Sequence, residues 1–257
     1  MKLKNKIFIE ILKKAVNGDL PSQCWLAYKF LTNKSNENLK QAIFWLQKAA
    51  AKNDSWAQYN LGLSYQKGEG VQKNKSKAIY WYKKSAEKGY DSAQLNLGII
   101  YANLRGKSKK LQEAVKLYHL ASKQGNANAQ YNLGLYYEKG RGVSRNYKIS
   151  FKWYLKSAKS GIVDAQHKVG YFYHEGFGVK ENFHQSVIWY KKAAQNGNIH
   201  SMYNLGLCYL YGEGTTKNLA NALKWFKLAA AKGHSSSKRQ IKKLIPGNVN
   251  KESKYRK

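Results

Sequence analysis

Ala57-Gln58-Tyr59-Asn60-Leu61-Gly62 is the stretch that decides the fold of this chain, because the sequence returns to it every 36 residues. The later copies are Ala93-Gln94-Leu95-Asn96-Leu97-Gly98, Ala129-Gln130-Tyr131-Asn132-Leu133-Gly134, Ala165-Gln166-His167-Lys168-Val169-Gly170 and Ser201-Met202-Tyr203-Asn204-Leu205-Gly206. A tyrosine follows three residues after the glycine of every copy, at positions 65, 101, 137, 173 and 209. A fixed period of this length indicates stacked structural repeats.

Each repeat is predicted to form two amphipathic helices, which we call helix A and helix B. In helix A, Ala57, Leu61, Gly62 and Tyr65 lie at i, i+4, i+5 and i+8, which places them on one stripe. Helix B carries a second stripe that reads Ala78-Trp81-Tyr82-Ala86, Ser150-Trp153-Tyr154-Ala158, Ser186-Trp189-Tyr190-Ala194 and Ala222-Trp225-Phe226-Ala230 in successive copies. Because one pair cannot bury both stripes, successive pairs must stack.

Glycines mark the connections between these helices. The loop from A to B reads Gly68-Glu69-Gly70-Val71, Gly140-Arg141-Gly142-Val143, Gly176-Phe177-Gly178-Val179 and Gly212-Glu213-Gly214-Thr215. No strand precedes this Gly-x-Gly, so we interpret it as a turn and not as a phosphate-binding loop. The third copy reads Leu104-Arg105-Gly106-Lys107, which predicts a tighter or differently packed connection there.

A further glycine recurs in the middle of helix A, at positions 62, 98, 134, 170 and 206. Glycine in a helix interior costs about 1 kcal/mol relative to alanine, so its recurrence predicts close approach of a neighbouring helix. We expect the aromatic residue of the facing helix to fill the space beside it.

The pattern Ala-x-x-x-Leu-Gly-x-x-Tyr-x-x-Gly-x-Gly-Val, followed by Ala-x-x-Trp-Tyr-x-x-Ala-Ala-x-x-Gly, resembles the Sel1-like repeat family, a relative of the tetratricopeptide repeat. The resemblance implies an all-α, right-handed superhelical solenoid of about six repeats, whose A helices line a concave groove. The predicted organisation is an N-terminal capping helix at 1–19, a degenerate repeat at 20–54, five repeats at 55–234, a C-terminal capping helix at 235–245 and a disordered basic tail at 246–257.

Composition excludes several classes of protein. The 257 residues carry a formal net charge of +32, yet 43% are apolar and 14% aromatic, far more core-forming material than a disordered basic chain contains. No run of 18 apolar residues or standard signal peptide is seen, so we expect a cytoplasmic protein with no membrane span. We also expect the protein to be monomeric. Cys24 and Cys208 are too few for a disulfide framework and are predicted to be buried thiols.

No catalytic constellation is visible in the sequence. His167, His174, Glu175 and His184 are close enough in sequence to suggest a transition-metal site, but exposed histidines at variable repeat positions are the preferred interpretation. We therefore predict no enzyme activity, no cofactor and no metal. Trp81, Trp153, Trp189 and Trp225 are interpreted as core residues and not as a base-stacking platform.

Two sets of residues are candidate contact sites. If helix A lines a groove, a ladder of amides there is able to hydrogen-bond the backbone of an extended peptide, and its members are Gln58, Asn60, Gln94, Asn96, Gln130, Asn132, Gln166 and Asn204. The alternative is that these amides only tie helix A to its neighbours. The second set consists of lysines of helix B, namely Lys84, Lys156, Lys191, Lys192 and Lys227.

Those lysines predict a basic convex face that attracts polyanions through counterion release. With few arginines for bidentate readout, sequence-specific recognition of nucleic acid is not supported. The leading hypothesis is a non-catalytic adaptor that binds a protein or peptide partner, with an acidic partner favoured by the charge. The alternative is a nonspecific binder of nucleic acid or another polyanionic surface.

Overall fold

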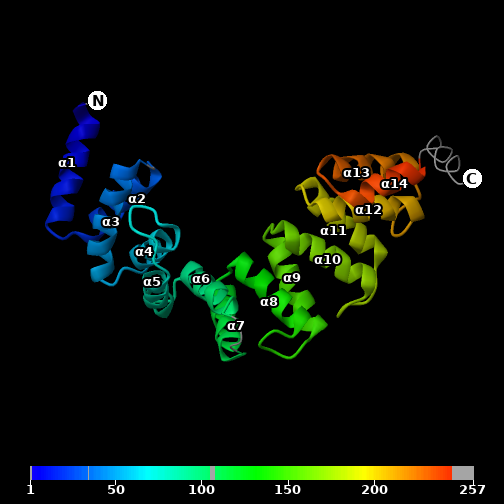
Figure 1. The fold of residues 1–257 in the computed structure, drawn as a ribbon, viewed down its shortest axis with the longest axis horizontal. Coiled ribbons are helices and arrows are strands. Elements are labelled where there is room, and N and C mark those ends of the chain that lie inside the picture. The colour runs from blue at the N-terminus through cyan, green and yellow to red at the C-terminus, as the bar shows by residue number, and fades with distance from the viewer. Residues whose placement is uncertain (1, 34, 105–107, 245–257) are drawn as a thin grey trace, which may run out of the picture. The chain divides into compact units, whose positions relative to one another are not determined.

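In a computed structural model, the structure describes residues 2–33, 35–104 and 108–244. Over these ranges every element of secondary structure is an α-helix, and no strand occurs (Figure 1). The chain forms two compact units, Met1–Ala129 and Gln130–Lys257, and the division between them falls within α8 (Ala127–Lys139). The predicted basic tail lies outside the described residues.

The first unit contains α1 (Lys2–Val16), α2 (Leu20–Thr32), α3 (Asn36–Ala51), α4 (Ser55–Lys67), α5 (Lys75–Glu87), α6 (Asp91–Ala102) and α7 (Ser108–Lys123). The second contains α9 (Tyr147–Lys159), α10 (Val163–Glu175), α11 (Phe183–Gln195), α12 (Ile199–Tyr211), α13 (Leu219–Ala231) and α14 (Ser235–Leu244). The predicted A helices are the even-numbered ones from α2, and the predicted B helices are the odd-numbered ones from α3. Within each unit, successive helices pack in chain order, as Figure 1 shows, so the predicted all-α repeat architecture is confirmed.

An asparagine starts most of the B helices. Oδ1 of Asn74, Asn146, Asn182 and Asn218 accepts a hydrogen bond of 2.8–2.9 Å from the backbone N–H three residues later, which satisfies one orphan donor of the first turn. The third repeat has Lys110 at this position. Its B helix, α7, begins at Ser108, three residues earlier in the repeat than α5 or α9. The altered connection predicted for this repeat therefore coincides with a longer helix, although residues 105–107 themselves lie outside the described ranges.

Every helical glycine of the repeat faces an aromatic ring of the B helix in the same pair. A Cβ atom on Gly134 would lie 2.5 Å from Cδ1 of Tyr154, and one on Gly170 would lie 2.7 Å from Cδ1 of Tyr190. The remaining pairs are Gly62 with Tyr82, Gly98 with Tyr118 and Gly206 with Phe226. These five rings are at most 2% exposed. The predicted close contact at the glycine column is thus confirmed.

The second glycine of the A-to-B loop makes a contact between repeats. Gly178 has φ +67°, and a Cβ atom there would collide with the backbone of Tyr147, at the start of the preceding B helix α9. Gly214 meets the backbone of Phe183 at the start of α11 in the same way. The loop is therefore a turn that packs on the previous repeat, which agrees with the interpretation made from the sequence. In the part of the chain described, no helix is both long and apolar enough to cross a bilayer.

Substitution of Gly134 by alanine tests the glycine–ring contact. In an ordinary helix interior this change adds about 1 kcal/mol of stability. Here the new methyl group meets the buried ring of Tyr154, so we expect the opposite sign, with a loss of about 1–3 kcal/mol in the free energy of unfolding. Urea denaturation measures it.

The matched control repeats Gly134→Ala in a Tyr154→Leu background, where the obstructing ring is gone. The cost of the alanine should shrink or reverse there. An equal cost in both backgrounds would show that the ring does not cause it.

Candidate interaction surfaces

The A-helix face is defined by the asparagine column and the lysine that interrupts it, and its members are Asn60, Asn96, Asn132, Lys168 and Asn204. All five side chains are half-buried. Nδ2 of Asn60 donates to the carbonyl of Trp56 one turn earlier in its own helix, at 2.8 Å. Nδ2 of Asn96 lies 3.4 Å from the hydroxyl of Tyr82, which belongs to the preceding repeat. In the first unit, these asparagines therefore have structural partners as well as partial exposure.

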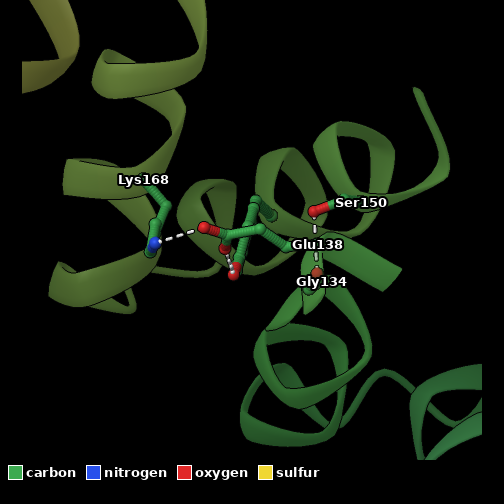
Figure 2. A network of polar contacts seen from close by, with 5 residues as sticks. Gly134, Glu138, Ser150 and Lys168 are labelled. Carbon is green, nitrogen blue, oxygen red and sulfur yellow. Dashed lines mark hydrogen bonds and ion pairs between the residues drawn. The ribbon is translucent and has the colours of Figure 1, made fainter. Parts of the chain in front are cut away.

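Lys168 replaces asparagine in this column, and its surroundings change with it. Its Nζ donates to Oε1 of Glu138 at 2.8 Å (Figure 2). The hydroxyl of Tyr154 donates to Oε2 of the same carboxylate at 2.5 Å. Two repeats earlier the equivalent positions hold Asn96, Gln66 and Tyr82, and the Tyr82 hydroxyl donates to Oε1 of Gln66 at 2.6 Å. Two neutral amides, Gln66 and Asn96, lie beside the hydroxyl of Tyr82. At the equivalent positions beside Tyr154, an ion pair takes their place.

The glutamines of the predicted groove are core residues. Gln58, Gln94, Gln130 and Gln166 are 1–7% exposed. Nε2 of Gln58, Gln94 and Gln166 donates to the carbonyl of Ala50, Ala86 and Ala158, respectively, at 3.2–3.4 Å. Each acceptor lies in the last turn of the preceding B helix, and each also accepts a hydrogen bond from the backbone N–H three residues later. Burial keeps all four from a peptide on the surface, and the amides of Gln58, Gln94 and Gln166 join successive repeats, which favours the alternative interpretation that these amides tie helix A to its neighbours.

Asn204 is the predicted groove residue that the structure places at a cavity. The cavity has a volume of about 230 Å³ and lies among α10, α11 and α12. Asn204 lines it together with His174, Glu175, Glu213, Tyr190 and Tyr211. Nδ1 of His174 is 2.9 Å from Glu175 Oε1, and its Nε2 is 3.2 Å from Glu213 Oε2. Burial lowers the pKa of His174, but the hydrogen bonds to the two carboxylates outweigh burial and raise it overall.

The sequence suggested that the histidines of this region are exposed, but in the structure only some of them are. His184 is exposed, whereas His167 is half-buried and its Nδ1 lies 2.9 Å from Oγ of Ser201. Burial lowers the pKa of His167 to about 4, with a smaller contribution from His200, whose ring centroid is 6.0 Å away. A histidine in the position held by tyrosine in other copies is therefore a neutral packing residue at pH 7.

Neither the cysteines nor the acid–base residues form a reactive cluster in the described parts of the chain. Both cysteines are free; Cys208 is buried and Cys24 is half-buried, a partial departure from the predicted burial. Burial raises the pKa of each thiol to about 12, so both remain protonated at neutral pH and are poor nucleophiles. No group of three or more His, Cys, Asp or Glu side chains is arranged to hold a metal ion in the same ranges.

The B-helix face is defined by the predicted lysines, Lys84, Lys156, Lys191, Lys192 and Lys227, which are all exposed. Nζ of Lys156 lies 4.7 Å from the ring centroid of Trp153, and Nζ of Lys192 lies 4.6 Å from that of Trp189. Between residues 2 and 244, leaving aside the gaps in the described ranges, none of the five forms an ion pair with a carboxylate. These cations are therefore available to a partner, although several lie over aromatic rings.

Helix pairs that interlock through glycine and a ring, and that repeat with a 36-residue period, define an α-helical solenoid repeat protein. The sequence model of the Sel1 repeat matches residues 20–54, 57–90, 91–126, 127–162, 163–198 and 199–234. The chain belongs to the Sel1 repeat family. Proteins of this family generally mediate protein–protein interactions and are generally non-catalytic repeat scaffolds.

Two solved structures illustrate the similarity. A Sel1 repeat protein from Oxalobacter formigenes is 33% identical, with 88% of this chain and 94% of that chain covered and a TM-score of 0.79. A protective antigen of uropathogenic Escherichia coli that displays the SLR fold is 34% identical, with 93% of this chain and 51% of that chain covered and a TM-score of 0.87. This chain thus spans about half the length of the antigen. Among curated proteins, none matches it.

The ion pair between Lys168 and Glu138 predicts an energetic coupling across a repeat boundary. Glu138→Gln or Lys168→Asn alone removes one charge and leaves the other, only 17–22% exposed, without its counterion. The double variant recreates the chemistry of Gln66 and Asn96 and should be more stable than the sum of the single effects predicts. We expect a coupling energy of about 0.5–3 kcal/mol from a double-mutant cycle in urea. Strict additivity would contradict a role for this pair in stability.

The low pKa of His167 predicts a loss of stability in mild acid. The unfolded chain takes up a proton near pH 6.5, whereas the folded one does so only near pH 4. Between these values the unfolded state binds more protons, so the contribution of His167 to stability falls as the pH drops from about 6.5 towards 4. Asp164 opposes the effect, whereas His200 and Lys168 reinforce it.

The test compares the melting temperatures of the parent and of His167→Tyr at pH 7 and pH 5. Tyrosine is the residue at equivalent positions 59, 131 and 203, so the variant should lose less stability than the parent on acidification. His184→Gln, at an exposed position, serves as the control and should behave like the parent. Equal acid sensitivity of His167→Tyr and the parent would contradict the assignment.

Proposed function

We propose that this protein is a non-catalytic scaffold that binds an extended segment of a partner protein along the part of the A-helix face that lies in the second unit. The observation that carries the proposal is the cavity at Asn204. It combines a half-buried amide, which donates and accepts hydrogen bonds, with the carboxylates of Glu175 and Glu213. Such a set suits the N–H and C=O groups of a peptide backbone. The family, whose members generally mediate protein–protein interactions, supports the same function.

The groove set that this proposal uses is smaller than the set named from the sequence. The glutamines are excluded by burial, and the amides of Asn60 and Asn96 bond to other groups of the first unit. Asn204 also has a hydrogen-bonding partner, the hydroxyl of Tyr190, but it lines a cavity as well. Asn204 and its equivalent Asn132 are the two residues of the second unit on which we expect peptide binding to depend. The partner is proposed to be a protein or peptide, bound by a monomer of this chain.

The B-helix face supports a second candidate function, the nonspecific binding of nucleic acid or another polyanion. The observation in favour of polyanion binding concerns four lysines of the second unit. In its described part, they are exposed and form no ion pair with a carboxylate, and they are Lys156, Lys191, Lys192 and Lys227. Binding of this kind is independent of sequence and weakens steeply with salt, because each neutralised phosphate releases condensed counterions.

One pair of variants separates the two functions. Peptides selected from a displayed random library on the parent protein, and a random DNA duplex, are the two probes. Asn132→Ala/Asn204→Ala should weaken peptide binding at least tenfold and leave DNA binding unchanged. Lys156→Glu/Lys192→Glu/Lys227→Glu should abolish DNA binding and retain the peptide at physiological salt. Both sets lie on helices of the second unit, so each variant controls for the folding of the other.

The proposal fails if the asparagine variant binds the selected peptides as the parent does. Loss of both probes from the lysine variant at physiological salt, with the asparagine variant unchanged, would identify the charge as the function.

A further inference from the structure

The B helices carry a tryptophan at the same repeat position in five of six copies. These residues are Trp45, Trp81, Trp153, Trp189 and Trp225, and the third repeat has Leu117 instead. An indole and an isobutyl group differ greatly in size, and protein interiors do not tolerate a large unfilled space without loss of stability. Around Leu117, the neighbouring side chains must therefore either fill the space that an indole fills in the other repeats or leave it vacant.

The clusters around the tryptophans show which surface an indole covers. Trp81 packs against a core cluster that contains Ala50 of the preceding repeat and Leu61 of its own repeat. Trp225 packs against the cluster that contains Ala194 and Leu205, which occupy the same two repeat positions. Each cluster against which one of these indoles packs thus contains an alanine near the end of the preceding helix B and a leucine of helix A in the indole's own repeat. For Leu117 of the third repeat the equivalent residues are Ala86, which lies near the end of helix B of the preceding repeat, and Leu97, which lies in the same repeat.

A cavity of about 300 Å³ lies at this place, among α5, α6 and α7. Ala86, Leu97, Tyr101, Leu117 and Leu120 form its apolar wall. Two of these five are the equivalents of the alanine and the leucine in the clusters against which Trp81 and Trp225 pack, and a third is the leucine that replaces the indole. The cavity is therefore the space that the missing tryptophan ring would occupy. Its size is at the lower end of the range of pockets that bind ligands.

A second departure from the repeat makes this cavity accessible and apolar. Lys84, Lys156 and Lys192 lie over aromatic rings at the position where the third repeat has Leu120. Leu120 is 49% exposed. The sixth repeat also has a leucine here, Leu228, but it retains its tryptophan. Only in the third repeat are both the ring and the lysine replaced by leucine, which leaves an open apolar surface in place of a cation over an indole.

The charged side chains at the rim of the cavity indicate which kind of ligand it favours. Glu87 is paired with Lys83 at 4.0 Å, and Glu113 with Lys110 at 2.6 Å. Lys116 is exposed, lines the cavity and has no carboxylate partner in the described ranges. Both carboxylates at the rim are thus paired with a lysine, whereas Lys116 is not paired with a carboxylate in the described ranges. The rim therefore favours an acidic partner.

We propose that the cavity among α5, α6 and α7 binds the side chain of a tryptophan from an acidic segment of a partner protein. The incoming indole takes the position that the protein's own tryptophan holds in the other repeats, and the acidic neighbours meet Lys116. This inference deepens the scaffold function and rests on it, but it concerns a different surface from the A-helix face.

The experiment uses two synthetic pentapeptides, acetyl-Asp-Glu-Trp-Glu-Asp-amide and the same peptide with alanine for tryptophan. Binding is followed by methyl resonances of leucine-labelled protein. The tryptophan peptide should shift the methyl groups of Leu97, Leu117 and Leu120 with a dissociation constant of about millimolar, as suits one anchoring side chain. The alanine peptide should bind at least tenfold more weakly.

Leu117→Trp fills the cavity from within. We expect its melting temperature to rise by roughly 2–4 °C, as for a modest gain in a chain of this length, and its affinity for the tryptophan peptide to fall at least tenfold. Leu228→Trp, which adds an indole at an exposed position of α13, is the matched control and should bind like the parent. Ala86→Leu fills the same cavity from the opposite wall and provides a second route to the same two results.

Three outcomes would overturn the proposal. Equal binding of the two peptides would assign the interaction to charge alone, and undiminished binding by both filled variants would place the peptide elsewhere. A fall in melting temperature for both Leu117→Trp and Ala86→Leu would show that the space is not vacant. None of these results alters the asparagine test on the A-helix face, so failure of the pocket and failure of the scaffold function are distinguishable.

Discussion

The approach of an aromatic ring to a backbone that carries no side chain sets the spacing of the two helices in every complete repeat. Gly134 and Tyr154 show the constraint at its tightest, since even a methyl group would overlap the ring. The glycine cannot become larger, and the ring cannot move without opening a buried space. The stripes, the loops and the contacts between repeats all depend on this fixed spacing, because each pair must present the same surface to the next.

The ring also determines the chemistry of the A-helix face. A tyrosine at this position carries its hydroxyl to that face, where it needs a hydrogen-bond partner. Tyr82 bonds to Gln66, and Tyr154 bonds to Glu138, which in turn pairs with Lys168. Groups that complete the packing therefore share this face with the residues proposed to contact a partner. A polar residue in this column is not by itself a contact residue, and the proposal selects Asn204 because it lines a cavity.

The sequence predicts the fold well because a period repeated five times overrides local uncertainty. The helix pairs, the role of the loop glycines and the contact at Gly134 follow from spacing and residue size alone. The candidate sites are less predictable. Gln94 has the amide of a surface residue, and only the position of Ala86 across the repeat boundary makes it a buried donor. His167 looks like a variable surface residue until its neighbours are seen to bury it. The break in the tryptophan column at Leu117 is visible in the sequence, but whether its neighbours close over the gap depends on their packing.

The buried glutamines have a consequence for how the solenoid fluctuates. The last turn of an isolated helix frays, because its carbonyls have no partners and little free energy separates the ordered and open forms. Here the last turns of α3, α5 and α9 are held from outside by an amide of the following repeat. A helix end cannot open without leaving that amide unsatisfied in the core. Local opening at the ends of α3, α5 and α9 is thereby tied to the opening of the next helix, so slow exchange of amide hydrogens should extend to the last turns of these three helices.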